Sequence, residues 1–526
     1  MKTPATFVPA DSASDRFLER ATLANFAIHG IAMITMALVL ARMLPGGGES
    51  DTMVRVTMIA EHPWRFRIGW LPWQLCAAID LLFAIALVRA RWIPKVPAIF
   101  SVVLTIAAVI PDQYAQALWI TRGVTMAEQA VKSGQLHAYL AFESEIFVWT
   151  ASWGAFFYTL AALGWTACFA KTPAWSRLLT WLSIPTWAAM LFVTTARFFP
   201  PHMRPAPEVI AAGNALGFTL LQIWLGLVGE GVLRRRRPTI AHGRLALWRY
   251  PSEGLVARVL NVIANSRLVA AFLEPLPDPA MLSDITDVVY VNYLVPAEKL
   301  LPFVPKGLEL QRLGPDGKYG LFTFLTYKHG HFGFRILGPL RRFMPSPLQT
   351  NWRIHVRDPR TGYQGIYFLT NAITNGFQAL GARLLTEGMP MHVLHDGEVR
   401  RDQKGSIELR LDPGSGSAPD AKATLSPSEQ PTFEGAWKEC FAGFRDFLAY
   451  CVPQDRALST QPWANEVTRH EIQLGIPLDH CEPLEGVVES KAATAIAGDT
   501  VAICFRVPSV AFRFEEEATD LLPIGG

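Results

Sequence analysis

The sequence predicts a two-part protein, in which a six-helix, all-α transmembrane bundle precedes a mainly β domain. Long apolar segments fill the chain up to residue 233 and stop at the basic run Arg234–Arg237. An apolar helix followed by arginines is typical of a membrane span that ends on the cytoplasmic side. Beyond about residue 286 the apolar residues recur at every second position, which is the period of a strand. We therefore expect two parts with different chemistry.

Six segments of the first part are candidate spans, since a helix needs about 20 apolar residues to cross a bilayer. They are residues 22–44, 68–88, 96–111, 146–170, 178–199 and 208–233, of which the third is the shortest. The loops at 89–95 and 171–177 and the arginine run are basic and would share one side, whereas Arg55, Arg65 and Arg122 fall on the other. The positive-inside rule then predicts both termini in the cytoplasm. The membrane that we expect is a bacterial inner membrane.

The pattern divides the chain into five parts. They are a cytosolic tail (1–21), the transmembrane domain (22–233), a basic stop with an amphipathic linker helix (234–279), a cytosolic β domain (280–515) and a C-terminal tail (516–526). Residues 251–273 of the linker predict one helix with an apolar stripe through Leu255, Val259 and Val262. That stripe either lies on the membrane surface or packs on the next domain, and packing is the interpretation that we favour.

Residues 112–145 are expected to form a long outer loop. It contains Thr125-Met126-Ala127-Glu128, a capping-box pattern that predicts the start of a helical stretch. Two interpretations stay open, a lid on the outer surface and a plain solvated connection.

Ionisable residues within or beside the spans are candidates for function, because polar groups are unfavourable in lipid. Asp80 lies inside the second span, His29 inside the first, and Asp112 follows the third. The alternative, which we favour, is structural: Asp80 pairs with a donor inside the bundle. His29 has no second histidine well inside another span, so no haem is expected.

Composition excludes several classes of function. The net charge of +3 is too small to indicate a nucleic-acid partner. The six cysteines are dispersed, without a CxxC motif, which predicts neither a zinc site nor a redox dithiol. No cofactor or metal is therefore expected, and the expected partners are a lipid bilayer and a small-molecule ligand.

Alternation and turn residues place strands through the second part. Strands are predicted at 286–293, 308–310, 319–328, 351–357, 364–370, 390–401, 405–412, 484–495 and 499–506. Residues 412–433, rich in Pro, Ser and Ala, predict a flexible loop, and Glu434–Tyr450 predicts one amphipathic helix. Many strands with few helices are typical of a β barrel or sandwich.

Several pieces of this part resemble a known family. A strand ending at Tyr293-Leu294-Val295 is followed by a short helix over Pro296–Leu301 and by Val304-Pro305-Lys306-Gly307-Leu308-Glu309. The order of these pieces, with Asn351–Arg357, Gly365–Leu369 and Ala379–Arg383 after them, resembles the YqjF-like family of the acetoacetate decarboxylase-like superfamily over about residues 280–515. The resemblance implies a cone-like β barrel with an internal pocket.

In the decarboxylases of that superfamily a buried lysine forms a Schiff base with a β-keto acid, which requires a neutral amine. The best matching stretch in this chain, Phe377-Gln378-Ala379-Leu380, contains no lysine. The resemblance therefore implies the fold without the decarboxylase chemistry.

Lys328 is the one candidate catalytic residue, because it ends an apolar strand just before His329-Gly330-His331. An exposed lysine at a strand end is the interpretation that we favour. His329 and His331 would share a strand face, but no third metal ligand has a fitting spacing.

Arg353, His355 and Arg357 predict a cationic strand face, opposite Trp352, Ile354 and Val356. Inside a barrel such a face would bind a carboxylate or phosphate, but the solvent-facing interpretation is favoured. The candidate substrate-binding residues are Arg353, His355, Arg335 and Tyr327.

Three hypotheses of function follow. The first is a membrane protein whose cytosolic barrel binds a small apolar or anionic ligand. The second is a lyase-type enzyme on a keto acid or a lipid-derived substrate, with Lys328, Arg353 or His355 in its pocket. The third is a transporter with a regulatory cytosolic domain.

Overall fold

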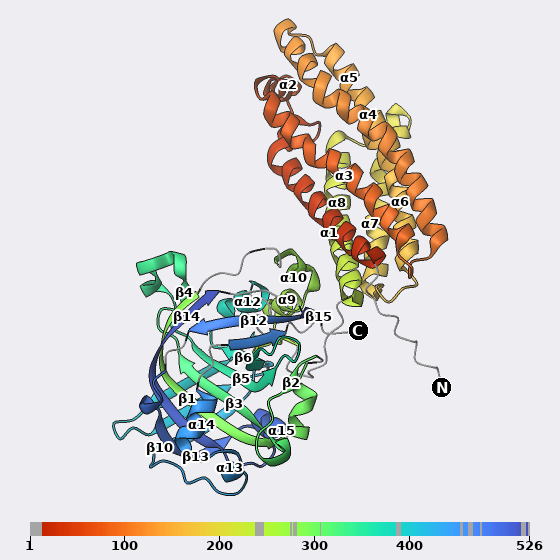
Figure 1. Ribbon diagram of the computed structural model, residues 1–526. Helices are drawn as coiled ribbons and strands as arrows, with labels where there is room; N and C mark the ends of the chain where they lie inside the picture. The colour runs from red at the N-terminus through yellow and green to blue at the C-terminus, as the bar shows by residue number, and fades with distance from the viewer. Residues whose placement is uncertain are drawn as a thin grey trace. The chain divides into compact units, whose positions relative to one another are not determined.

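The computed structural model describes residues 13–236, 247–273, 276, 281–305, 307–385, 391–452, 456–460, 466–473, 476–516 and 522–523 (Figure 1). The chain divides into two compact units, Met1–Arg236 and Arg237–Gly526. The first is helical and the second is built on a curled sheet. The predicted fold class, an all-α bundle followed by a mainly β domain, is thereby confirmed.

Six helices of the first unit are long and apolar enough to cross a membrane. They are Ala13–Met43, Pro63–Arg89 (α3), Lys95–Ser133 (α4), His137–Phe169, Arg177–Thr195 (α7) and Pro207–Arg235. The first consists of α1 (Ala13–Thr35) followed by a π-helical and a 3₁₀ turn, and the last lies within α8 (Pro207–Arg236). The fourth consists of α5 (His137–Phe147) and α6 (Ala155–Phe169), joined by a π-helix. A shorter helix, α2 (Thr52–Glu61), lies between the first two. Large apolar side chains such as Ile34, Leu75 and Trp181 are exposed on the unit, as lipid-facing residues are.

The region predicted as a long outer loop is helical, so that prediction is wrong. Helix α4 continues from Lys95 through Pro111 to Ser133 and ends at Gly134, whose φ is +68°. A glycine in that left-handed conformation is a common helix end. Helix α5 then begins at His137. The segment Thr125–Glu128 therefore lies within α4 and starts no helix.

The predicted single linker helix is two helices, α9 (Leu255–Ala264) and α10 (Arg267–Leu273), bent by 57° at the break between them. The side chain of Asn265 bonds the backbone of Trp248 through both its oxygen and its nitrogen. Helix α9 is thus fixed to the segment that precedes it within the second unit.

The strands in the described residues of the second unit form a single sheet of fifteen strands. They are β1 Met281–Pro296, β2 Glu309–Leu310, β3 Tyr319–Lys328, β4 Gly333–Phe334, β5 Leu348–Arg357, β6 Gln364–Ile373, β7 Met391–Val393, β8 Asp396–Arg401, β9 Ile407–Asp412, β10 Ala421–Pro427, β11 Arg456–Thr460, β12 Glu466–Gln473, β13 Glu482–Glu489, β14 Ile503–Glu516 and β15 Leu522–Pro523. Strand β10 lies within the segment predicted as a flexible loop, so that prediction is wrong as well.

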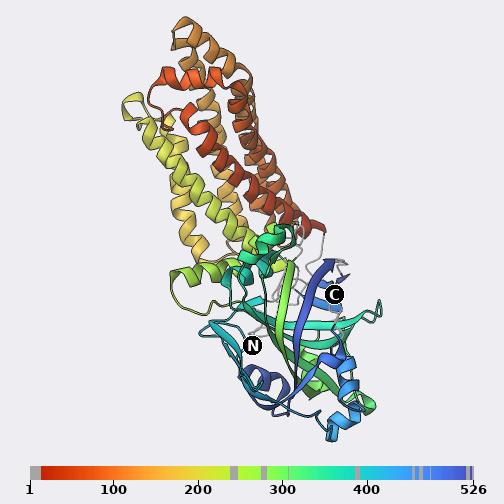
Figure 2. The same ribbon diagram turned by 90° about the vertical axis from the view of Figure 1, so that its left-hand side faces the viewer.

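Strand pairing closes part of this sheet into a ring. The order β14–β1–β3–β5–β6–β11–β12 returns to β14, because β12 also pairs with β14. Strands β13, β10, β9 and β8 continue from β14 as an arm. The long strands β1 and β14 run antiparallel, side by side, through the centre of the sheet (Figure 2). Each of the seven ring members has a partner on both edges over at least part of its length.

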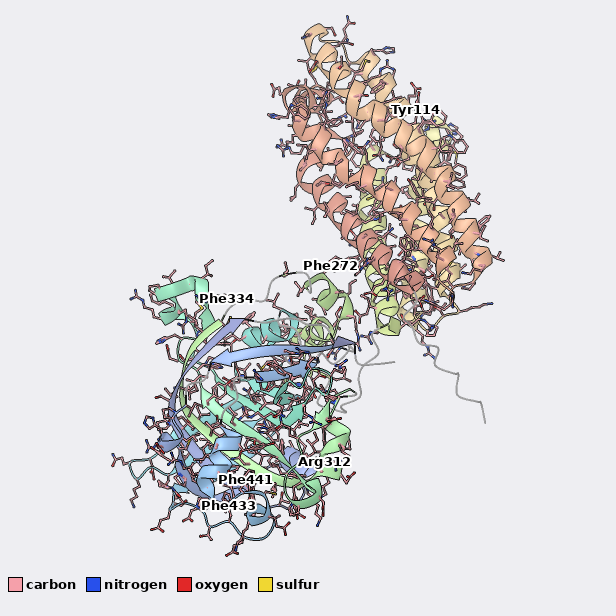
Figure 3. The ribbon with its side chains drawn as sticks, viewed as in Figure 1. Tyr114, Phe272, Arg312, Phe334, Phe433 and Phe441 are labelled. Carbon is pink, nitrogen blue, oxygen red and sulfur yellow. The ribbon has the colours of Figure 1, made fainter. Side chains whose placement is uncertain are left out.

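The two faces of the central strands pack against different parts of the second unit. Trp352 and Ile354 join a core that includes residues of β9 and β10. The opposite face carries Tyr290 and packs on α14 (Phe444–Cys451) through an aromatic cluster. Its members Phe433 and Phe441 flank the short helix α13 (Gly435–Cys440) in sequence and lie together beside the sheet (Figure 3). The single helix predicted over Glu434–Tyr450 is therefore two helices.

Other short elements of the second unit include α11 (Ala297–Leu300), the 3₁₀ segment η9 (Arg335–Phe343), α12 (Gly376–Leu385) and α15 (Lys491–Ala497).

Candidate functional site

Two basic residues of strand β5 point into the protein interior. Arg353 and His355 lie on the α14-covered face and are 3% and 5% exposed. The solvent-facing interpretation of this strand face is thus wrong for both residues. Only Arg357, at the strand end, is exposed, and it pairs with Glu309 of β2. The predicted alternation with Trp352, Ile354 and Val356 is confirmed, and helix α14 makes the polar side an interior one.

Tyr290 of β1 is the main neighbour of the buried guanidinium. The Arg353 Cζ atom lies 5.4 Å from the centroid of the Tyr290 ring, a distance at which a cation is attracted to an aromatic face. Burial raises the pKa of Tyr290 to about 12, although the charge of Arg353 opposes the rise. Burial also lowers the pKa of Arg353, because the charged form loses its hydration. The Tyr290 ring thus stabilises the charge of Arg353, although the phenol supplies no negative charge of its own.

A chain of hydrogen bonds leads along this face to Tyr327. Ser283 Oγ lies 2.7 Å from His329 Nδ1, and His329 Nε2 lies 2.8 Å from Gln349 Oε1. Gln349 Nε2 donates to Asn351 Oδ1 at 2.8 Å, and Asn351 Nδ2 donates to the Tyr327 hydroxyl at 3.1 Å. Because the amide oxygen of Gln349 only accepts, His329 Nε2 carries a proton. Burial lowers the pKa of His329 to about 4, so Nδ1 accepts from Ser283 at neutral pH.

Helix α14 closes the other side of the site. The His355 ring stacks on Tyr450, with ring centroids 4.7 Å apart. Burial, with the nearby charge of Arg353, lowers the pKa of His355 to about 3. Asn292 Oδ1 accepts hydrogen bonds from Thr323 Oγ1 at 2.8 Å and from Cys451 Sγ at 3.1 Å. These bonds tie α14 to β1 and β3 beside Arg353.

Several buried polar atoms of β5 and β6 have no hydrogen-bond partner. They are Nε and Nη2 of Arg353, Nε2 of His355, Oγ1 of Thr370, and both Oδ1 and Nδ2 of Asn371. Asn371 of β6 pairs with Asn351 of β5, and Asn351 lies two residues before Arg353 in the chain. Within the described ranges no aspartate or glutamate forms an ion pair with Arg353. Buried polar atoms are nearly always satisfied, so such a group points to a partner from outside the chain.

The structure separates the other sequence candidates from this group. Lys328 is exposed at the end of β3, and Arg335 is exposed in η9. His331 has a φ of +51° and is exposed, so it does not share a face with buried His329, contrary to the prediction. Every lysine whose exposure the structure describes is exposed. No group of metal-binding residues occurs in the described part of the chain.

Asp80 and Asp112 have partners within the helical unit. Asn25 Nδ2 donates to Asp80 Oδ1 at 2.6 Å, and His29 Nε2 lies 3.8 Å from Asp80 Oδ2. Gln116 Nε2 lies 3.0 Å from both carboxylate oxygens of Asp112. The contacts of Asp80 agree with the structural interpretation, in which it pairs with a donor inside the bundle, and that donor is Asn25.

Sequence reasoning did not select Tyr290, Asn292, Asn351, Asn371 and Cys451. Their signal was present in part, because Tyr290 and Asn292 alternate with apolar residues on β1, and Asn351 shares the alternating set of Arg353. Tertiary packing determines which of the two alternating sets of residues α14 covers, and no local sequence pattern indicates it.

Residues 283–458 match a family model that is described as an uncharacterised conserved protein, DUF2071. No curated protein matches the chain. Three solved structures are similar to part of it. Acetoacetate decarboxylase from Legionella pneumophila is 12% identical, with a TM-score of 0.32, over 46% of this chain and 89% of that one. An acetoacetate decarboxylase-like enzyme from Sphingomonas wittichii is 12% identical, with a TM-score of 0.33, over 47% and 95%.

The enduracididine biosynthesis enzyme MppR is 14% identical, with a TM-score of 0.33, over 48% of this chain and 90% of that one. The family match covers the strands that carry Tyr290, Tyr327, Arg353 and His355. The DUF2071 match, at residues 283–458, lies entirely within the second unit.

Proposed function

We propose that this membrane protein binds a small carboxylate in its C-terminal domain, with Arg353 as the principal anchor. The observation that supports the proposal is a buried guanidinium with two unsatisfied nitrogens and no acidic partner in the described ranges. A charge in that position is unfavourable until an anion joins it. A carboxylate accepts two parallel hydrogen bonds from a guanidinium, which matches the free Nε and Nη2 atoms.

The surroundings of Arg353 define the rest of the ligand. Asn371 offers a free donor and a free acceptor, and the Tyr327 hydroxyl accepts from Asn351, which leaves its own proton available to a ligand. The adjoining core contains Phe441, Phe447 and Phe505. A small carboxylate with an apolar body and one further polar group fits this mixture.

Schiff-base catalysis is not favoured by the position of the lysines. An amine that attacks a keto acid has to be neutral, which requires burial or neighbouring cations, and Lys328 is exposed. Transport is not favoured either, because Asp80 and Asp112 are each held by donors within the bundle. Ligand binding is therefore the function that we propose.

We further propose that the domain works at the cytoplasmic face of a bacterial inner membrane, with both termini in the cytoplasm. The support is the basic run at the end of α8 and the basic residues between α3 and α4 and between α6 and α7. A cytosolic ligand would then reach a domain that is tethered to the bilayer.

The test is a thermal-shift titration of the full chain in detergent with acetate, pyruvate, longer 2-oxo acids and inorganic phosphate. We expect carboxylates to raise the melting temperature of the C-terminal unit. The Arg353→Met variant should lose that shift without losing stability in the absence of ligand, because an apolar replacement removes an uncompensated buried charge.

Arg357→Met is the matched control, since Arg357 lies on the same strand but is exposed and paired with Glu309. It should keep the full ligand response. A wild-type protein that no anion stabilises, together with an Arg353→Met variant that unfolds, would make Arg353 a structural residue and overturn the proposal.

A further inference from the structure

Helix α9 presents an uncovered apolar stripe. Its small residues Ala257 and Ala264 are buried against the domain, whereas Leu255, Val256 and Val262 are more than two-thirds exposed, at 77%, 70% and 70%. At 100° per residue these three and Val259 fall on one side of the helix. The packing interpretation of the linker therefore accounts for one face of α9 and leaves the opposite, apolar face in solvent.

A second segment at the same end of the domain repeats this pattern. The 3₁₀ segment η9 has no buried residue, and Ile336 at 93% and Phe343 at 68% are exposed in it. Phe334, just before η9, is labelled in Figure 3 and is also exposed. Phe377, at the start of α12, is 91% exposed. Two views of the domain place α9 and the segment after β4 at one end of the sheet (Figure 1, Figure 2).

Contacts join these segments into one surface. Gln378 Nε2 of α12 donates to the carbonyl of Phe332, just before β4. Arg383 Nε of α12 donates to the carbonyl of Ala264, the last residue of α9. The side chains of Leu260, Phe332 and Leu380 pack against a shared core. We call the exposed residues Val256, Val259, Val262, Ile336, Phe343 and Phe377 the apolar surface.

Arginines border the apolar surface. Arg258 of α9 and Arg335 and Arg342 of η9 are exposed, with Glu253 as an exposed acid near α9. The Arg342 guanidinium lies 4.8 Å from the centroid of the Phe343 ring. Aliphatic and aromatic residues beside arginines are the composition of elements that lie in the interface of an anionic bilayer.

We propose that the apolar surface rests in the headgroup region of the bilayer that the helical unit spans. Eighteen residues separate Arg236, the end of α8, from Leu255. Fully extended, they reach about 60 Å at most. The tether therefore limits the distance between the surface and the end of α8, and this limit raises the effective concentration of bilayer over that of any free protein partner.

The experiment uses the full chain in nanodiscs of phosphatidylglycerol and phosphatidylcholine. A bimane label is attached to single added cysteines at Val259→Cys, Ile336→Cys and Phe377→Cys. Val501→Cys is the matched control, because Val501 is 82% exposed and lies beside Ile503, which pairs with Asn292 at the far end of β1 from β4. The chain without an added cysteine gives the background from its own cysteines.

We expect doxyl groups on the lipids to quench the three labels severalfold more than the label at 501, and iodide in the water to quench them less. Iodide quenching equal to that at 501 would show a surface in water and overturn the proposal. Labels that neither quencher reaches would show a protein cover, from the helical unit or a second copy, and would overturn it too.

The role of the arginines is tested separately. Replacing Arg335 and Arg342 together by glutamine, or using phosphatidylcholine alone, should weaken the lipid quenching at 336 and 377. Quenching that is unchanged under both conditions would remove the arginines from the proposal. Arg335 and Arg342 are exposed whereas Arg353 is buried, so neither substitution removes a group of the buried candidate site.

Discussion

Arg55 and Glu143 form a two-pronged ion pair inside the helical unit. Nη1 and Nη2 of Arg55 lie 2.5 and 2.8 Å from the two carboxylate oxygens of Glu143, and both side chains are almost fully buried. Tyr139 adds a hydroxyl 3.4 Å from Glu143 Oε1. The pair joins α2 to the part of α5 that lies within the predicted outer loop, residues 112–145.

We predict that Arg55→Ala destabilises the helical unit by about 3–5 kcal/mol, because it leaves the Glu143 charge buried and alone. The double variant Arg55→Met with Glu143→Leu should be clearly milder. Thermal unfolding in detergent measures both. Arg42→Ala is the control, since Arg42 is exposed and lies 4.0 Å from Glu49. Equal losses for the single and double variants would contradict the prediction.

The stability of the C-terminal domain should fall as the pH falls below about 6.5. Burial holds the pKa of His329 at about 4 and that of His355 at about 3, both below the unfolded value of 6.5. The unfolded chain therefore binds more protons in that window, and the free energy of unfolding rises with pH through it. The stabilisation is complete above about pH 6.5 and is lost towards pH 4 for His329 and pH 3 for His355.

The His355→Phe variant isolates one of these groups, because phenylalanine still stacks on Tyr450 but does not titrate. Each pKa unit corresponds to about 1.4 kcal/mol, so wild type should lose several kcal/mol more than this variant on acidification. Hydrogen exchange of β3 and β5 at several pH values is the measurement. Parallel pH profiles for the two proteins would show that His355 is charged inside the fold.

Helices α4 and α6 pack too closely for a side chain at Gly164. A Cβ atom there would lie 2.2 Å from Ser101 Oγ and 3.3 Å from Ser101 Cβ. Gly164→Ala should therefore lower the melting temperature of the helical unit, and Ser101→Gly in the same chain should restore most of the loss. Gly381→Ala is the control, because a Cβ at Gly381 meets nothing within 4 Å. A Gly164→Ala protein as stable as this control would contradict the close contact.

Borohydride trapping with a panel of keto acids should give no adduct at Lys328. Its amine is exposed at the end of β3 and lies outside the buried polar group around Arg353. Intact mass and peptide mapping after reduction provide the measurement, and Lys328→Ala should leave the carboxylate thermal shift unchanged. An adduct at Lys328 would favour the enzyme hypothesis over the binding hypothesis.

The sequence predicted the order of the two parts and most strands, because hydrophobic period is a local property. It did not predict the length of α4, since Pro111, Asp112 and Gln113 resemble the end of a span although the helix continues to Ser133. A proline and a run of polar residues change the hydropathy without ending the backbone hydrogen bonding of a supported helix.

The candidate site shows the same limit. Alternation in β5 correctly grouped Arg353 with His355, but the period does not say which face is covered. The cover comes from α14, whose Tyr450 stacks on His355. That contact joins residues far apart in the chain, so only the tertiary structure turns an ordinary polar strand face into a buried cationic one.

The pairing of β1 with β14 also determines when the sheet can be completed during synthesis of the chain. Val289 lies beside Arg506, so β1 obtains one of its two main neighbours only after roughly two hundred further residues have left the ribosome. The six spans are complete long before that point and are free to insert. Until β14 has been synthesised, the edge of β1 that pairs with β14 stays open, and an open strand edge is prone to pair with other chains. A premature stop before β14 would therefore produce an inserted bundle that carries an aggregation-prone sheet, a species for membrane-bound quality control to remove.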